Sequence, residues 1–319
     1  MHVPFWVWAA TVAGLSVLIA VDFFVGRKPH RVSLREAALW GVFWVVAAGV
    51  FCAGLWWSGG AREAGEFLAG YVTEKSLSVD NLFVFVLIMS RFAVPAELRQ
   101  RVLLVGVLLA LVMRTAFIAL GAAVIASFTW VFFIFGAVLV WTAWKLVTGG
   151  GTAEEEFHEN ALLRRVRKAL PSTEGYHGTR LTVREAGRRL VTPLFVVIVA
   201  LGTTDLLFAL DSIPAIFGLT KDPYIVFTAN AFALMGLRQL YFLIGSLLDR
   251  LIYLSYGLAA ILGFIGVKLV LEALPSIGVH PPHISTSLSL SVIAVVLAAT
   301  AAVSLIVAAR RNSDTPAAV

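Results

Sequence analysis

The sequence predicts an all-α polytopic membrane protein with about nine transmembrane helices. Of its 319 residues, 60% are hydrophobic and only 14% are charged, which is far from the composition of soluble domains. The apolar residues gather in runs of roughly 20, the length at which a helix crosses the hydrocarbon core of a bilayer. The basic residues lie between these runs, where they act as topology signals rather than as a nucleic-acid surface.

Nine runs are long enough to be candidate spans. We expect the first to be retained in the membrane, because its basic residues, Arg27, Lys28 and Arg31, follow it instead of preceding it as in a signal peptide. The candidate spans lie near residues 4–25, 37–57, 67–90, 101–126, 129–148, 191–217, 224–247, 251–274 and 286–309.

The lysines and arginines between the spans predict the topology. With the N-terminus outside, nearly all of them face the cytoplasm, and only Arg62 and Lys221 fall in external loops, as the positive-inside rule requires. The C-terminus is then cytoplasmic. We divide the chain into an N-terminal membrane half with two leading helices and the first repeat (1–148), a cytoplasmic loop (149–190), a second repeat (191–274) and a final helix with the C-terminal tail (275–319).

The loop 149–190 is the only long hydrophilic segment. It opens with three glycines, continues through the acidic run 154–156 and then becomes basic. Two interpretations stay open: an amphipathic helix over 154–170 on the anionic inner leaflet, or a solvated linker. Before the second and sixth spans, Ser33 and Thr182 each stand three residues ahead of a glutamate, which is the pattern of a helix N-cap.

Two short polar stretches, 74–81 and 203–214, interrupt spans that are otherwise apolar. Each has two carboxylates six residues apart and an oxygen-bearing side chain directly after the second. A carboxylate at bilayer depth is costly and normally marks a binding site or a pathway. The carboxylates and the side chains after them are Glu74, Asp80 and Asn81 in the first stretch, and Asp205, Asp211 and Ser212 in the second.

The two stretches belong to a repeat of three spans. In the first copy Arg114 and Lys145 follow in the next two spans, and in the second copy Arg238 and Lys268 do so. Because each copy crosses the membrane three times, the second copy must begin on the opposite side from the first. The sequence therefore predicts an inverted repeat. In such repeats the substrate site lies at the interface of the copies, near the bilayer midplane.

We expect both polar stretches to break their helices. Six residues turn an ideal helix through about 600° and raise it by about 9 Å, so two carboxylates at this spacing cannot face one ion. The expected breakers are Ser76, Ser78 and Pro214. Freed carbonyls, carboxylates and neutral oxygens such as that of Asn230 would then form an oxygen cage, which Mn²⁺, Mg²⁺ and Ca²⁺ prefer.

An alternative is that these side chains form buried ion pairs between helices, with Asp80 bound to Arg114 and Asp211 bound to Arg238. Asp22, near the inner end of the first span, is a further candidate, as a cation ligand in a cytoplasmic vestibule. The chain has one cysteine, so it can form neither an intramolecular disulfide nor a thiolate cluster.

Three segments carry a resemblance to a known family. The sequences EKSLSVDNLF (74–83), DLLFALDSIPAI (205–216) and FTANAFALMGLRQLYF (227–242) resemble the TerC family of integral membrane proteins, named from tellurium resistance and related to the LysE-type transporters. The resemblance implies a bacterial inner-membrane protein linked to manganese efflux, to metal supply for exported proteins and, in some members, to tellurite resistance.

Matched position by position, the resemblance implies a metal site. Many family members carry a glutamate three residues before the first aspartate of the second motif, where this chain has Gly202, so a ligand of the family pattern is missing here. The residues that the resemblance assigns to the metal are Glu74, Asp80, Asn81, Asp205, Asp211 and Ser212.

These observations predict a secondary transporter, not an enzyme, that exports a divalent cation, with Mn²⁺ as the expected substrate. We expect no cofactor beyond the transported cation, and no nucleotide-binding motif is present in the sequence. Two other functions stay open. One is a non-transporting scaffold that binds stress-response proteins through the loop 149–190, and the other is an oxyanion exporter that uses Arg114 and Arg238.

Overall fold

The computed structural model describes residues 3–25, 33–128, 130–148, 173, 175–185, 188–244, 253–279, 281 and 284–313. This part of the chain forms ten α-helices, a short 3₁₀ helix and one β-hairpin. In chain order they are α1 Phe5–Val25, α2 Leu34–Gly59, α3 Ala61–Arg91, α4 Ala96–Ser127, α5 Val131–Thr148, β1 Thr182–Glu185, β2 Arg188–Val191, α7 Pro193–Phe217, α8 Pro223–Met235, α9 Leu237–Ile244, α10 Leu254–Ala273, η2 Leu274–Ile277 and α11 Thr286–Ser313.

The predicted class, an all-α polytopic membrane protein, is confirmed. Every predicted span overlaps a helix, and α8 with α9 forms the seventh. In the described residues, eight spans are long and apolar enough to cross a membrane. The remaining predicted span, 67–90, is helical as expected. It is too polar to count among these eight, because α3 carries the first polar stretch. The number nine therefore stays a prediction.

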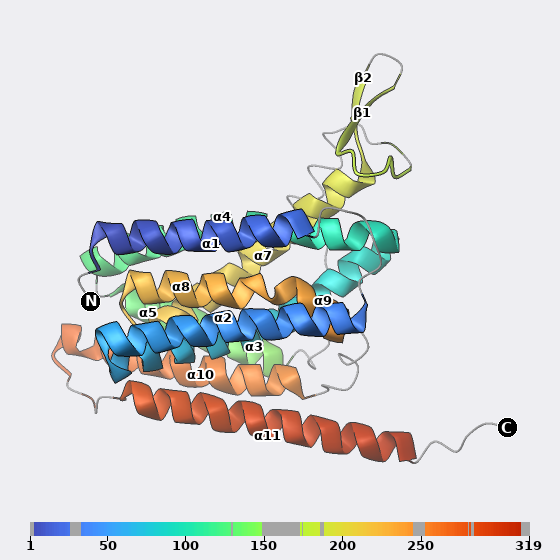
Figure 1. Ribbon diagram of the computed structural model, residues 1–319. Helices are drawn as coiled ribbons and strands as arrows, with labels where there is room; N and C mark the ends of the chain where they lie inside the picture. The colour runs from blue at the N-terminus through green and yellow to red at the C-terminus, as the bar shows by residue number, and fades with distance from the viewer. Residues whose placement is uncertain are drawn as a thin grey trace.

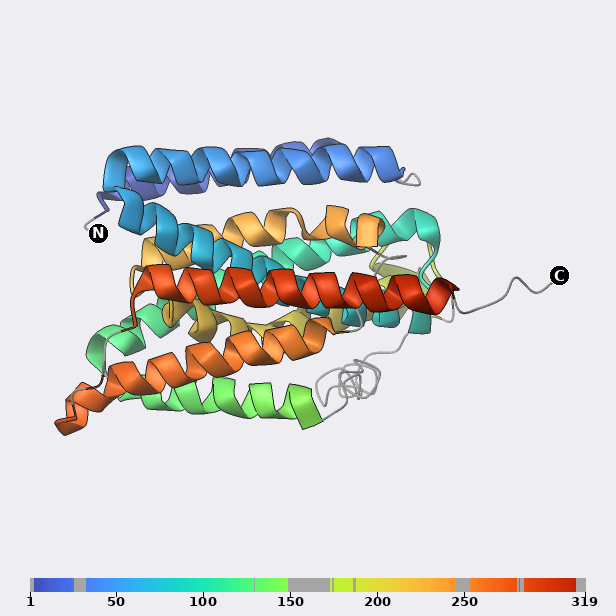
Figure 2. The ribbon, with the colours of Figure 1, turned by 90° about the horizontal axis from the view of Figure 1, so that it is seen from below.

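The long helices lie side by side with their axes roughly aligned, as Figures 1 and 2 show. The core lies among α3, α4, α7 and α8, and every residue of α8 from Tyr224 to Met235 is buried. On one side α1 and α2 cover α8, while on the other α5 packs against α10, and α11 lies against α3 and α10. The most polar span is therefore enclosed by apolar helices.

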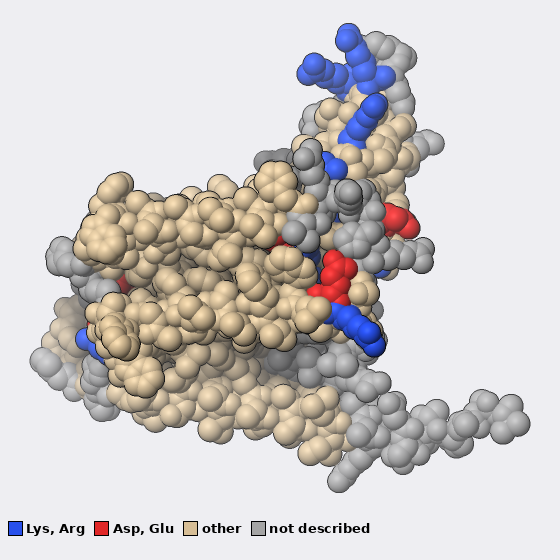
Figure 3. All heavy atoms as spheres, in the orientation of Figure 1, with Lys and Arg blue, Asp and Glu red and all other residues tan. Residues whose placement is uncertain are grey.

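The outer helices present apolar side chains. Large exposed hydrophobic residues are spread along α1, α2 and α11, among them Trp6, Val45, Trp57, Val295 and Ile306. Figure 3 shows charged atoms mainly at the ends of the helices and on the projecting hairpin, with few along the flanks. A continuous apolar surface of this extent marks contact with lipid.

Helix packing supports the predicted repeat. Helix α3 packs against α8 as α4 packs against α7, and α5 packs against α10. If α3 is exchanged with α7, α4 with α8–α9, and α5 with α10, the same three contacts result. Two matched units are expected to show this symmetry. The opposite insertion of the two copies stays a prediction.

Both polar stretches lie within unbroken helices, so the predicted breaks at Ser76, Ser78 and Pro214 are wrong. Ser76 donates to the carbonyl of Val72 in its own helix at 2.7 Å, which leaves the backbone ladder in place. Pro214 lies in the last turn of α7, so the one backbone bond that it removes is lost near the end of the helix.

The interruption in the second repeat lies at Gly236, between α8 and α9. Lys75, the residue after Glu74, donates from Nζ to the carbonyl of Ala233 at 3.0 Å. A Cβ added to Gly236 would lie 2.5 Å from the same Nζ. Lys75, from the first polar stretch, thus stabilises the interruption between α8 and α9. The absence of a side chain at Gly236 leaves room for its ammonium group.

The loop 149–190 shows one ordered feature among its described residues, the antiparallel hairpin β1–β2. Ser33 caps α2 as predicted, since its hydroxyl accepts from the backbone N–H of Glu36 at 3.2 Å. Thr182 begins β1 and caps no helix, so that part of the prediction is wrong. The amphipathic helix considered for 154–170 lies outside the described residues.

Two glycines let α5 and α10 approach closely. A Cβ on Gly136 would lie 2.8 Å from the carbonyl oxygen of Gly266 and 2.6 Å from Val270 Cγ2. Gly136→Leu is therefore expected to lower the free energy of unfolding by about 1–3 kcal/mol through overpacking, measured by thermal unfolding in detergent. The control is Gly49→Leu, because a Cβ at Gly49 in α2 meets nothing within 4 Å. Equal effects of the two changes would contradict the close approach.

Candidate functional site

Arg114, in the middle of α4, is completely buried and joins three helices. Its Nε and Nη2 donate to the two carboxylate oxygens of Asp205 on α7 at 3.0 and 2.9 Å. Nη1 donates to Glu74 Oε1 on α3 and to Ser212 Oγ on α7, the latter at 3.0 Å. The fork on Asp205 is the bidentate geometry that makes arginine–carboxylate pairs strong. We call Glu74, Arg114, Asp205 and Ser212 the buried cluster.

Helical periodicity explains which polar residues meet. Asp205 and Ser212 are seven residues apart, about two turns, so they share one face of α7. Glu74, Ser78 and Asn81 are spaced by four and three residues and share one face of α3 in the same way. Ser78 and Asn81 are buried as well. The matched faces of the two repeats therefore point toward the interior of the protein.

Several polar atoms around the buried cluster have no hydrogen-bond partner among the described residues. They are Glu74 Oε2, Ser78 Oγ and both amide atoms of Asn230. Asn230 lies on α8, which packs against α3. Buried polar atoms are normally bonded, and each exception calls for a reason. Three of these four atoms are oxygens, the ligand atoms that hard divalent cations use.

The charges of the buried cluster do not cancel. Glu74 and Asp205 carry two negative charges when ionised, and Arg114 supplies one positive charge. Charges this deep are retained only when they are paired and hydrogen-bonded. The pairing observed here gives every guanidinium nitrogen of Arg114 an acceptor and leaves one carboxylate oxygen of Glu74 unbonded within the described structure.

Asp211, the second carboxylate of the second stretch, lies apart from the buried cluster. Asp211 is half-buried and accepts from Thr142 Oγ1 on α5 at 2.9 Å. The backbone of Asp80 belongs to α3, and its side chain lies outside the described residues. Because α3 and α7 are unbroken, residues six apart face different ways, so Asp211 does not share the cluster of Asp205.

The ion pairs differ from the alternative that the sequence suggested. Arg238 binds Asp22 of α1, with Nη2 to Oδ1 at 2.6 Å, rather than Asp211. Arg114 binds the first carboxylates of both stretches. At the opposite end of the helices, beyond the C-terminus of α7, Lys221 Nζ lies 3.0 Å from Glu272 Oε2. The two arginines of the repeat therefore have different partners.

No group of three or more His, Cys, Asp or Glu side chains in the described ranges could hold a metal ion. A cation at the buried cluster would have two carboxylates, completed by hydroxyl and amide oxygens. The predicted ligand set of Glu74, Asp80, Asn81, Asp205, Asp211 and Ser212 thus stays a prediction. A glutamate at Gly202 would require Leu109 to move, because a Cβ there would lie 2.4 Å from Leu109 Cδ2.

Two residues near the site were missed as site residues. Ser78 was considered only as a helix breaker, although its spacing from Glu74 and Asn81 indicates one helix face. Thr142, the donor to Asp211, lies in an apolar run, and nothing in its local sequence points to that contact.

Comparison with known proteins gives the same family as the motifs. The sequence pattern described as Integral membrane protein TerC family matches residues 59–312. An uncharacterized membrane protein of Mycobacterium tuberculosis (strain CDC 1551 / Oshkosh) is 47% identical over 300 residues, which cover 90% of this chain and 76% of that protein. An uncharacterized membrane protein of Myxococcus xanthus is 42% identical over 300 residues, covering 94% and 92%.

A third relative has a descriptive name. Alx of Escherichia coli (strain K12), named as a proposed membrane-bound redox modulator, is 39% identical over 296 residues, with 90% of each chain covered. No solved structure matches this chain. The matched pattern includes both polar stretches and the buried cluster that they form with Arg114. This chain belongs to the TerC family of integral membrane proteins.

Proposed function

We propose that this protein is a secondary transporter that exports a divalent cation, with Mn²⁺ as the expected substrate, across the bacterial inner membrane. The observation that carries the proposal is the meeting of the first carboxylates of both polar stretches, Glu74 and Asp205, at one buried arginine. Ionisable residues at this depth are functional by default. Their place where the two repeated units meet is where transporters of this architecture hold substrate.

The oxygen chemistry of the site supports a hard cation. Carboxylates, hydroxyls and amides surround the site, whereas soft metals such as copper(I) would call for thiolate or thioether ligands. Arg114 lies between the two carboxylates, so a cation that binds both must displace its guanidinium. Arg114 would then compete with the cation for the two carboxylates. This competition would help to release the cation when the helices rearrange.

The proposed coupling uses protons. No nucleotide-binding motif is present in the sequence, so an ion gradient or the membrane potential must drive export. Carboxylates that exchange a metal ion for protons need no further group. In the orientation that we propose, the N-terminus is outside, and the C-terminus and the hairpin β1–β2 are cytoplasmic, because the basic side chains then lie inside.

The other functions have weaker support. Oxyanion export would require free guanidinium groups, but Arg114 donates to two carboxylates and Arg238 is bound to Asp22. The redox role in the name of Alx cannot rest on an intramolecular thiol pair here, because the sequence has only Cys52. A scaffold that binds proteins through the loop 149–190 is the alternative that the experiment must separate from transport.

The test measures manganese in cells. Cells that produce the protein are expected to hold less Mn²⁺ and to tolerate more of it than cells without it. The matched control is the neutral variant E74Q/R114L/D205N, which removes the three charges of the buried cluster together. Equal Mn²⁺ contents in all three strains would contradict the proposal. Increased tolerance without a change in Mn²⁺ content would favour the scaffold.

A further inference from the structure

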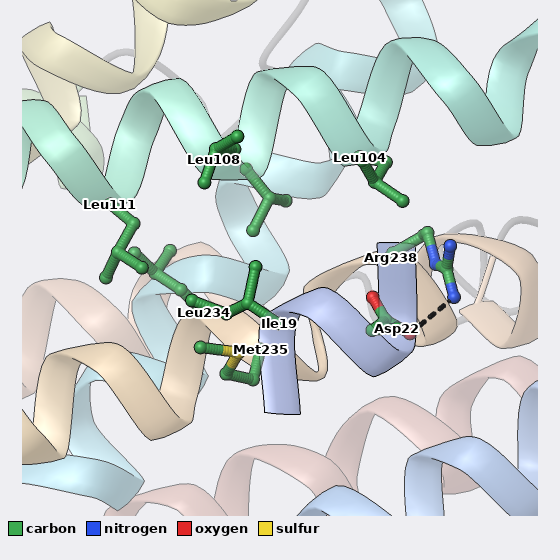
Figure 4. A pocket seen from close by; sticks show the side chains of 9 residues that line it. Ile19, Asp22, Leu104, Leu108, Leu111, Leu234, Met235 and Arg238 are labelled. Carbon is green, nitrogen blue, oxygen red and sulfur yellow. Dashed lines mark hydrogen bonds and ion pairs between the residues drawn. The ribbon is translucent and has the colours of Figure 1, made fainter. Parts of the chain in front are cut away.

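A pocket lies between α1, α4 and the α8–α9 interruption. Figure 4 shows an ion pair, Asp22 with Arg238, at one end of it and apolar side chains along the rest. Leucines of α4 form one wall, and Ile19 of α1 faces Leu234 and Met235 of α8. An apolar pocket that ends on a charged pair is unusual beside lipid, because an ionised residue there normally belongs to a pathway.

On α4 the deep end of this pocket lies one helical turn from the buried cluster, and on α8 it lies one turn from Asn230. On α4, Leu111 precedes Arg114 by three residues, and on α8, Leu234 follows Asn230 by four. One turn of helix is about 5.4 Å. Leu111 also packs against two of the apolar core groups, the one around Phe217 and the one around Val197. Leu111 and Leu234 therefore form a short apolar barrier between the pocket and the buried cluster.

The shallow end carries polar side chains on both sides of Arg238. A second, smaller pocket is lined by Glu36, Gln100 and Gln239 together with Arg238 itself. Arg238 thus separates the polar pocket from the apolar one. The hydrogen bond from Arg238 to Asp22 ends on Oδ1. In Figure 4 the other oxygen of Asp22 lies on the side of the apolar pocket.

The interruption at Gly236 gives Arg238 a means to move. Arg238 stands in the first turn of α9, directly after the break, while α8 is held through the bond from Lys75 to Ala233. Breaks of this kind can absorb a change of backbone angles while the flanking helices stay intact. A rotation of α9 would separate Arg238 from Asp22 and leave α8 and Asn230 in place.

We propose that this pocket is the inner access route of the cation to the buried cluster, and that the Asp22–Arg238 ion pair is its gate. The proposal rests on the proposed function and adds the route. A divalent cation arriving from the polar pocket competes with Arg238 for Asp22. When Arg238 swings away with α9, Asp22 supplies the first carboxylate ligand, and the cation passes Leu111 and Leu234 to reach Glu74 and Asp205.

The test labels a single cysteine with a charged, membrane-impermeant methanethiosulfonate reagent in inside-out vesicles. In a Cys52→Ser background, Leu111→Cys is expected to react slowly while the ion pair is intact. The pair-free variant D22N/R238Q should raise the rate of labelling about tenfold or more, as expected when a closed state loses an ion pair that only it makes. The charge-swapped variant D22R/R238D should restore slow labelling.

Three controls make the result specific. Gly175→Cys, at an exposed residue before the hairpin, reports that the inner face is accessible. Glu272→Gln breaks the pair with Lys221 at the other end of the protein and should leave the rate at Leu111→Cys unchanged. Val112→Cys, whose native valine is 61% exposed on α4 and does not line the pocket, should stay unreactive to the charged reagent in every background.

The outcomes separate this inference from the proposed function. Equal rates with and without the ion pair would overturn the gate. Reaction of Leu111→Cys with a lipid-soluble maleimide but never with the charged reagent would show a lipid crevice and overturn the route. Labelling needs no transport, so either result leaves the proposed function standing. Mn²⁺ should slow the labelling of Leu111→Cys in the D22N/R238Q variant. If only this protection is missing, the result contradicts a cation as the occupant of the route and leaves the gate standing.

Discussion

Arg114→Leu is expected to lower the free energy of unfolding by about 3–5 kcal/mol, because it leaves two buried carboxylates without their shared partner. Arg114, Glu74 and Asp205 are all at most 1% exposed. Water therefore cannot replace the four hydrogen bonds that Arg114 donates to its three partners. Thermal unfolding of the purified protein in detergent measures the loss.

The neutral variant E74Q/R114L/D205N should recover most of that stability. Replacing a whole buried ionic group costs far less than removing one partner, because no uncompensated charge remains. The control is Arg62→Leu, because Arg62 is exposed and Glu66, its buried partner, still accepts from Thr220; a pair with one member in solvent adds little to stability. An R114L protein as stable as the wild type would show that the carboxylates are not held by this arginine.

The spans could be predicted closely because their signal is local. Runs of about 20 apolar residues are needed wherever a helix crosses lipid, and each of the nine runs overlaps an observed helix. The capping residue Ser33 was predictable for the same reason. Thr182 shows the limit of such reasoning, since the same pattern of a hydroxyl three residues before a glutamate begins a β-hairpin there. Pairing with β2, several residues further on, outweighs the local preference.

The site was predictable in its residues but not in its contacts. The doubled spacing of carboxylates identified Glu74 and Asp205, and the repeat identified Arg114 and Arg238. The expected breaks in α3 and α7 were wrong, and so was the alternative pair of Asp211 with Arg238. With α3 and α7 unbroken, the spacing of seven residues decides which side chains share a face, and this brings Glu74 and Asp205 together at Arg114.

The partner of Arg238 could not be read from the repeat. Asp22 lies on α1, which precedes both repeated units and has no counterpart in them. Nothing in the local sequence indicates which face of α1 meets α9, because α1 is apolar around most of its circumference. The contact depends on how a peripheral helix docks onto the repeated core, and only the three-dimensional structure supplies that.

Asp211→Asn is expected to reduce Mn²⁺ transport at least about tenfold, since one lost charge contact with a divalent ion exceeds the roughly 1.4 kcal/mol that a factor of ten requires. The fold should survive, because an asparagine can still accept from Thr142, and Arg238 keeps Asp22 as its partner. Uptake of Mn²⁺ into proteoliposomes measures transport, and thermal unfolding checks the fold. Thr142→Val is the matched control, because it removes the hydrogen bond, keeps the charge and should retain most of the transport. Wild-type transport by Asp211→Asn would mean that this carboxylate only braces α7 against α5, and that the cation path is confined to the buried cluster around Arg114.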